Sequence, residues 1–204
     1  MLCRGIFRGD TLLNITGRDL AASLISMYGP RVTTALAIDK QYTKSNLPIC
    51  LELTMLVDHW EVSIAQFKIS PNGKTFAPGN LRATTDNPNY AKLITYWIEN
   101  KYTLRYSGGL VPDVYHILIK GQGVLSNASS PTAKAKLRLL FEASPIAFII
   151  EAAGGASCVC ASESQEAVQP VSLLDVVVND LDRRVGVCYG SIDEVERFKQ
   201  NIFQ

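Results

Sequence analysis

The fold is decided by residues 136–155, which read KLRLLFEASPIAFIIEAAGG. The first seven residues, Lys136 to Glu142, predict a short strand. Ser144 then stands as a helix N-cap before Pro145, and the pair Gly154-Gly155 predicts the end of that helix. The helix is apolar nearly all round, so we expect it in the core. A strand followed at once by a buried helix indicates an α/β layer.

The same alternation continues on both sides of this stretch. Helices are predicted over residues 89–100, from Pro112 at the first helical position to about Lys120, and after a capping box at Ser191–Glu194. Short strands are predicted between them, over residues 102–106, 123–126 and 185–189. Strands and helices that alternate at this length favour the α/β fold class.

The first 70 residues read differently. Runs of strand-forming residues occupy 31–38, 49–57 and 60–69, and one helix is predicted over 17–28, with Thr16 as its N-cap. The turn Ser70-Pro71-Asn72-Gly73 follows. We therefore predict two parts, a β-rich part with one covering helix over residues 1–75 and an α/β domain over residues 76–204.

Composition limits the function. The chain has 204 residues, with 20 Lys and Arg against 19 Asp and Glu, which excludes a strongly basic nucleic-acid binder. No run of 18 apolar residues predicts a membrane span, and the first ten residues show neither a signal peptide nor a transit peptide. Five scattered cysteines form no disulfide framework and indicate a reducing compartment, and a metal role for the pair Cys158 and Cys160 has little support.

Two strand ends carry candidate chemistry. Ligands of α/β layers bind where strands end and helices begin. Glu142 ends one predicted strand, and Arg105-Tyr106 ends another before the loop Ser107-Gly108-Gly109. With Lys134 and Lys136 in a nearby loop, these residues suit a phosphorylated substrate and a hard divalent ion.

The alternative at each position stays open. Glu142 could pair with Arg138, both lysines could lie in a solvated loop, and Arg105 could form an ordinary surface ion pair. The residues by themselves indicate an α/β domain with a candidate anion site.

Several runs also resemble the class I fructose-1,6-bisphosphatase and sedoheptulose-1,7-bisphosphatase family. These are YTLRYSGGLVPDV (102–114), SPTAKAKLRLLFE (130–142), FAPGNLRAT (76–84) and Tyr28-Gly-Pro-Arg31. The sequences of the second and third of these runs are closer to those of the sedoheptulose enzymes. The resemblance implies the C-terminal α/β domain of the sugar-bisphosphatase fold, preceded by the end of a β-rich N-terminal domain. In the complete family the layers run α-β-α-β-α.

The resemblance implies roles for five residues. Lys136 matches a lysine that holds a sugar phosphate, Arg105 and Tyr106 match a pair at the second phosphate, and Asn80 matches a phosphate-binding asparagine. Glu142 matches a glutamate that binds a metal ion, which implies Mg²⁺. The arginine reaches the neighbouring subunit's site in the fructose enzymes, which implies a homodimer or homo-oligomer.

Other family features do not carry over. The family has a sugar-facing tyrosine where this chain has Asn127 or thereabouts, so that role is not transferred. The main metal motif, Asp-Pro-Leu-Asp-Gly-Ser, and its upstream glutamates are absent. We therefore expect no catalytic residue within the chain, severely impaired Mg²⁺ binding by the chain alone, and a correspondence to the C-terminal domain plus the tail of the N-terminal domain.

The function implied is hydrolysis of the 1-phosphate of sedoheptulose 1,7-bisphosphate, in the cytoplasm or the plastid stroma. Two alternatives remain. One is the corresponding reaction of fructose 1,6-bisphosphate. The other is a non-catalytic protein that binds sugar phosphates or docks onto a full-length relative. Neither nucleic acid nor a membrane is expected as a partner.

Overall fold

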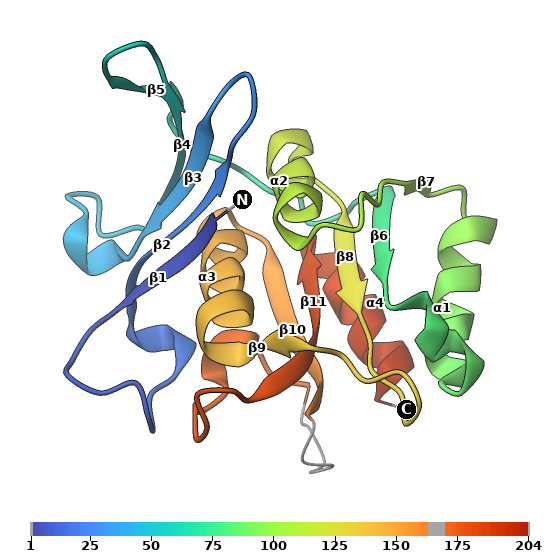
Figure 1. The fold of residues 1–204 in the computed structure, drawn as a ribbon. Helices are drawn as coiled ribbons and strands as arrows, with labels where there is room; N and C mark the ends of the chain where they lie inside the picture. Colours follow the sequence, from blue (N-terminus) through green and yellow to red (C-terminus); the bar gives the residue numbers. More distant parts are fainter. Residues whose placement is uncertain (1, 163–169, 204) are drawn as a thin grey trace.

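The computed structural model describes residues 2–162 and 170–203. Two β-sheets lie side by side, and helix α3 (Ser144–Ala152) lies between them (Figure 1). The architecture is mixed α/β, as predicted.

The first sheet is an antiparallel meander. Its strands pair in chain order: β1 (Leu2–Phe7), β2 (Leu20–Met27), β3 (Thr33–Ile38), β4 (Ile49–Met55) and β5 (Trp60–Ile64). The three strands predicted here are confirmed, although the last ends at Ile64 rather than residue 69. One face of the sheet packs against α3.

The predicted helix over residues 17–28 is wrong. Thr16 does form a capping box, but the helix behind it is a single 3₁₀ turn, η1 (Gly17–Asp19). The chain then continues as β2, which pairs with β1 on one side and β3 on the other. Apolar spacing over twelve residues cannot exclude a strand, and pairing on both edges overrides helix propensity.

The second sheet is mixed. Its strands lie in the order β10 (Ala156–Ser162), β11 (Arg184–Gly190), β8 (Val124–Asn127), β6 (Thr75–Gly79) and β7 (Thr103–Leu104). Strand β9 (Leu137–Arg138) pairs with the start of β11. Strands β6, β7 and β8 are parallel, whereas β10 and β11 are antiparallel to their neighbours.

The other helices cover this sheet. Helices α1 (Pro88–Glu99) and α4 (Ile192–Ile202) pack against each other, and α4 also contacts β10 and β11. Helix α2 (Leu110–Lys120) lies near β8 and β2. These helices were predicted, although Pro112 occupies the third position of α2 rather than the first. Short helical turns occur at η2 (Lys40–Tyr42), η3 (Leu81–Thr85) and η5 (Leu173–Asp175).

The strand predicted over residues 136–142 is wrong beyond its first part. Only β9 is a strand, and a π-helical turn, η4 (Leu139–Ala143), leads directly into α3. Leu139, Leu140 and Ala143 are all buried, and this i, i+1, i+4 spacing is helical rather than alternating. Ser144 therefore lies inside a continuous helical path. Its buried hydroxyl has no hydrogen-bond partner in the described part of the chain, so it is not an N-cap.

The predicted capping box of α4 is also wrong, although the helix begins where expected. The Ser191 hydroxyl accepts a hydrogen bond from the backbone N–H of Gly123 instead. The buried carboxylate of Glu194 accepts from Trp97 Nε1 at 3.0 Å and from the Tyr102 hydroxyl at 2.7 Å. Tertiary partners have replaced the local ones.

A single apolar cluster joins the two sheets. It includes Leu20 and Ile25 of the first sheet, Ile146 and Ile149 of α3, and Val187 of the second sheet, all fully buried. A second cluster lies under α1 and α4 around Trp97. Among the described residues, none of the helices is long and apolar enough to cross a membrane.

Candidate active site

The candidate site lies along one edge of the second sheet. Gly79 and Asn127 are the last residues of the parallel strands β6 and β8, and they are directly paired. Tyr106 lies two residues after the end of β7. Between them, the backbone N–H of Arg105 donates to the carbonyl of Phe76 in β6 at 2.9 Å, which keeps this segment next to β6. The carboxyl ends of parallel strands are the usual ligand-binding edge of such sheets.

A small cavity of about 140 Å³ opens at this edge. It is lined by Gly79, Tyr106, Gly108, Leu110, Asp113, Leu125, Asn127 and Leu137. Of the five predicted site residues, only Tyr106 lines it, while Lys136 immediately precedes the lining residue Leu137. The structure thus brings Tyr106 and the Lys136 segment together.

Asp113 is a candidate that the sequence did not reveal. It lies in the first turn of α2 and is only 4% exposed. Its Oδ1 accepts a hydrogen bond from the Ser107 N–H at 2.7 Å, which fixes the loop that follows Tyr106. Gly108 in this loop has a φ of +83°, a conformation that favours glycine. An aspartate four residues after Gly109 in a predicted helix could have signalled this contact.

Two polar atoms of the cavity residues lack partners. Asp113 Oδ2 and Asn127 Oδ1 are both buried, and neither has a hydrogen bond among the described residues. An unpaired buried acceptor costs about 1–3 kcal/mol, so such atoms call for a donor. Ligand hydroxyl groups are donors that would fit a cavity of this size.

The loop after β8, which carries Lys134 and Lys136, is held by side chains of the segment that follows β6. Asn80 Nδ2 donates to the carbonyls of Ala128 and Ala133, at 2.8 and 2.7 Å. Asp86 Oδ2 accepts from both the N–H and the hydroxyl of Thr132. Hydrogen bonds from Ser130 and Thr132 lower the pKa of Asp86. Asn80 adopts the left-handed conformation, with φ at +51°, and its amide nitrogen holds this loop.

The predicted cations are exposed. Arg105 Nη1 donates only to the neighbouring carbonyl of Leu104, and Lys136 is exposed with no ion pair among the described residues. The pKa of His116 is lowered mainly by burial, next by the charge of Lys120, and then by the charge of Arg105. Both cations are therefore free to meet an anion, but neither lines the small cavity.

Glu142 lies apart from the cavity lining. It sits in the π-helical turn, and its Oε2 accepts a hydrogen bond from the Arg138 N–H at 2.7 Å, whereas the Arg138 side chain pairs with Asp182. Burial raises the pKa of Cys3 to about 12, and the negative charge of Glu142 adds to this rise. In the described part of the chain, no three His, Cys, Asp or Glu side chains are grouped to hold a metal ion. A metal-binding role for Glu142 stays a prediction.

Comparison with known proteins identifies the fold. Residues 69–203 match the family model of the fructose-1,6-bisphosphatase C-terminal domain. Chloroplastic sedoheptulose-1,7-bisphosphatase from Spinacia oleracea is 47% identical over 199 residues, covering 98% of this chain and 48% of the relative. Class 1 fructose-1,6-bisphosphatase from Pelobacter propionicus is 35% identical over 192 residues, covering 94% and 54%. The chain spans about half the length of these curated relatives.

Solved structures agree with these matches. A structure named for sedoheptulose-1,7-bisphosphatase from Toxoplasma gondii superposes with a TM-score of 0.81 at 43% identity, covering 94% of this chain and 59% of that one. Fructose-1,6-bisphosphatase from Leishmania major shares the fold, with a TM-score of 0.76 at 22% identity, covering 91% and 55%. The mixed sheet, the helices around it and the match over residues 69–203 together place the chain in the fructose-1,6-bisphosphatase family.

Proposed function

We propose that the protein binds a sugar bisphosphate at the edge of the second sheet and serves its hydrolysis at the 1-phosphate. Sedoheptulose 1,7-bisphosphate is the proposed substrate. Relatives named for that enzyme are 43–47% identical to the chain, against 31–35% for those named class 1 fructose-1,6-bisphosphatase. Fructose 1,6-bisphosphate is the second candidate, since the same cations would serve both sugars.

The observation that carries the proposal is the cavity beside Tyr106. Asp113 Oδ2 and Asn127 Oδ1 are buried acceptors that receive no hydrogen bond from residues 2–162 and 170–203, and sugar hydroxyls would supply the donors. Arg105 immediately precedes Tyr106 in the chain, and Lys136 immediately precedes Leu137, so two of the lining residues have a cationic residue as chain neighbour. Charge-assisted hydrogen bonds from these side chains would hold the phosphate groups.

Each predicted substrate-binding residue has a proposed task. Lys136 and Arg105 attract the phosphates, and the Tyr106 hydroxyl donates a hydrogen bond to one of them. Asn80 is proposed to serve the substrate by holding the lysine loop, because its amide nitrogen already donates to two carbonyls.

Hydrolysis of a phosphate monoester in this family depends on a divalent metal ion, and Mg²⁺ is the proposed ion. Glu142 is proposed to supply one oxygen ligand. Because the described residues hold no acidic cluster, no metal-dependent step is assigned to them. We expect the purified 204-residue chain to release no phosphate from sedoheptulose 1,7-bisphosphate with Mg²⁺ present. Measurable release would contradict this expectation and exclude the non-catalytic alternative.

We further propose self-association and a compartment. The exposed Arg105 is free to enter the site of a second copy, as the family resemblance implies, so a homodimer or larger homo-oligomer is expected. Light scattering during gel filtration would show a mass of at least two chains, and a monomer would contradict it. The plastid stroma is proposed because three relatives carry the word chloroplastic in their names, with the cytoplasm as the alternative.

Titration calorimetry of the chain with sedoheptulose 1,7-bisphosphate, without metal, tests the binding claim. Lys136→Gln and Arg105→Gln are each expected to weaken binding about tenfold or more, because each removes a charge-assisted contact. Lys44→Gln, at an exposed lysine of the first sheet's loop, is the matched control and should bind as the unmodified chain does. Equal affinity for fructose 1,6-bisphosphate would contradict the substrate assignment. Unchanged affinity in both site variants would overturn the site.

A further inference from the structure

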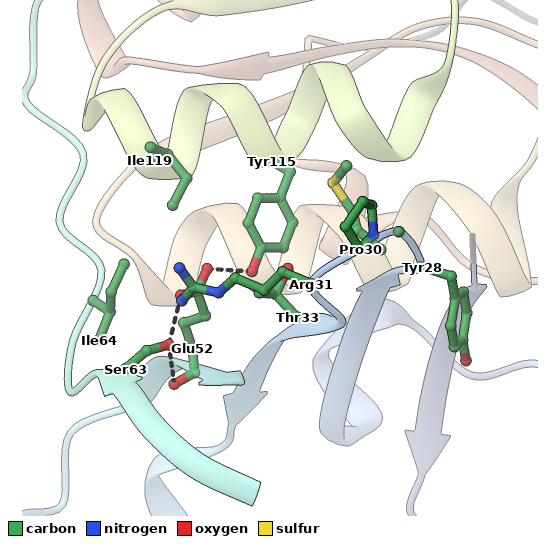
Figure 2. A pocket seen from close by; sticks show the side chains of 11 residues that line it. Tyr28, Pro30, Arg31, Thr33, Glu52, Ser63, Ile64, Tyr115 and Ile119 are labelled. Atoms are coloured by element: carbon green, nitrogen blue, oxygen red, sulfur yellow. Dashed lines mark hydrogen bonds and ion pairs between the residues drawn. The ribbon is translucent and has the colours of Figure 1, made fainter. Parts of the chain in front are cut away.

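A larger cavity lies away from the sugar site, between the first sheet and helix α2. Its volume is about 700 Å³, within the usual range of about 300–1,000 Å³ for small-molecule pockets. Figure 2 shows side chains that line it from three directions: the turn between β2 and β3, the strands β4 and β5 with the residues around them, and α2. Arg31 extends across it between the sheet and the helix (Figure 2).

A buried carboxylate forms the floor. Glu52 is only 3% exposed, and it accepts hydrogen bonds from the hydroxyls of Ser63 and Tyr115 and from Arg31 Nη2 at 3.2 Å. Burial and the hydrogen bond to Glu52 raise the pKa of Tyr115, so its hydroxyl stays protonated and donates. Three donors therefore satisfy the carboxylate, and little of its charge faces the cavity.

Arg31 keeps donors to spare. Both of its hydrogen bonds found among the described residues use Nη2, to Glu52 and to Thr54 Oγ1 at 2.7 Å. A guanidinium group has five N–H donors, so Nη1 and Nε can meet a further acceptor. The Arg31 side chain is 62% exposed, against 4% for Glu52. The charge presented at the cavity surface is thus positive.

The remaining walls are largely apolar. Ile64 and Ile119 lie on the side where the guanidinium ends, and Pro30 lies on the other side (Figure 2). Met27 also lines the cavity. Ile119 is 52% exposed, so its contact with a bound apolar group would remove area from water. One exposed cation among aliphatic side chains is the arrangement that an amphipathic anion requires.

We propose that this cavity binds a small organic monoanion, a carboxylate with an apolar body. The carboxylate accepts from Arg31 Nη1 and Nε, and the apolar body packs against Ile64 and Ile119. The site shares no lining residue with the cavity beside Tyr106, so it does not depend on the proposed sugar-phosphate function.

Charge balance selects a monoanion rather than a phosphate dianion. Arg31 and Glu52 are the two charged residues that line the cavity, and their charges cancel. A carboxylate adds one negative charge beside a guanidinium that can take a second partner. A dianion adds two negative charges close to the buried carboxylate of Glu52. Pairing with one arginine would not offset the resulting repulsion.

Fluorescence anisotropy of 2-naphthoate, titrated with the full chain, tests the proposal. Thirteen non-hydrogen atoms at about 0.3 kcal/mol each predict a Kd of about 1 mM or tighter. The neutral analogue 2-naphthalenemethanol should bind at least about tenfold more weakly, because it lacks the charge-assisted contact. Inorganic phosphate should not displace the probe at equal concentration.

Two variants locate the site. Arg31→Gln removes the cation yet leaves a donor for Glu52, and Ile119→Asp puts a like charge on the exposed apolar wall. Each should weaken naphthoate binding about tenfold or more. Arg4→Gln, at an exposed arginine of β1, is the matched control and should leave binding unchanged.

Circular dichroism must show that each variant is folded. Four results would each overturn the proposal. They are no anisotropy change with the chain at about the expected Kd, equal binding of the neutral analogue, displacement by phosphate, and unchanged binding in both site variants.

Discussion

Asp113 is the residue on which the proposed sugar site most depends. One carboxylate oxygen fixes the loop after Tyr106, and the other is buried with no donor among the residues that the structure describes. Asp113→Asn keeps an acceptor for the Ser107 N–H but turns the free acceptor into a donor. A hydrogen bond to a charged group contributes about 1.5–3 kcal/mol, so affinity for the sugar bisphosphate should fall by about tenfold or more.

Calorimetry checks this, with Asp10→Asn at an exposed position as the control. An Asp113→Asn chain that folds and binds as tightly as the unmodified chain would show that no sugar hydroxyl uses this oxygen.

His116 should make stability depend on pH. Burial lowers its pKa below the usual value of 6.5, Lys120 and Arg105 lower it further, and Asp113 opposes them. Between the lowered pKa and 6.5 the unfolded chain binds more protons than the folded one, so the free energy of unfolding from this group rises with pH. The contribution is lost as pH falls through that window.

Urea unfolding between about pH 5 and about pH 7.5 measures the effect. His116→Gln should flatten the slope, because it removes the group whose pKa is lowered. An equal slope in the His116→Gln chain would show that other groups cause the pH dependence.

The positions of the site residues were partly predictable from the sequence, and their roles stay proposals. Tyr106 was expected at a phosphorylated ligand and lines the cavity, and the lysine loop was expected nearby. Asp113 was missed because an acidic residue in a first helical turn is explained by the helix dipole alone. Its contact with Ser107 depends on the path of the glycine loop, which spacing does not fix.

Among the elements, strand β11 depends on a glycine at its end. Gly190 has a φ of +141°, and a Cβ there would clash with the carbonyl of Gly123, just before strand β8. Gly190→Ala therefore has to displace β8 or distort β11, and we expect a loss of stability of about 2 kcal/mol or more. Thermal unfolding measures it.

Gly9→Ala is the matched control for that prediction. Gly9 also has a positive φ, of +86°, but no atom lies within 4 Å of the point that a Cβ would occupy. The substitution should cost only the backbone strain, about 1–2 kcal/mol. Equal losses in the two variants would show that the close approach of β11 to β8 does not matter.

Local patterns placed most helices and strands correctly, and failed where distant partners decide. The segment 17–28 has helical spacing, yet β1 and β3 both offer it hydrogen bonds, so it is a strand. The segment 136–142 was predicted as one strand, but its buried leucines turn into the start of α3. In both cases the residues that decide the conformation lie outside the segment itself.

The whole molecule is held together by α3, which packs between the two sheets. The apolar cluster around Ile146 and Ile149 includes residues of both sheets, so separating them would expose it. We therefore predict that the described parts unfold together in one transition. The division at residue 75 stays a proposal, supported by the end of β5 at Ile64 and the start of β6 at Thr75.

Cooperativity can be checked with one tryptophan variant. Trp97 of α1 is fully buried, whereas Trp60 in β5 is 46% exposed. In a Trp60→Phe chain, fluorescence reports only the second sheet's region, and circular dichroism reports both sheets. Coincident urea midpoints are expected, and two separated midpoints would show that the sheets unfold independently.

A backbone amide NMR titration of the chain with sedoheptulose 1,7-bisphosphate tests directly whether the edge of the second sheet binds a sugar bisphosphate. We expect saturable shifts confined to residues 79–80, 105–113, 125–128 and 134–138, which include the residues that line the cavity beside Tyr106. Shifts at the first sheet instead, or none at saturating ligand, would contradict the claim that this sheet edge binds a sugar bisphosphate.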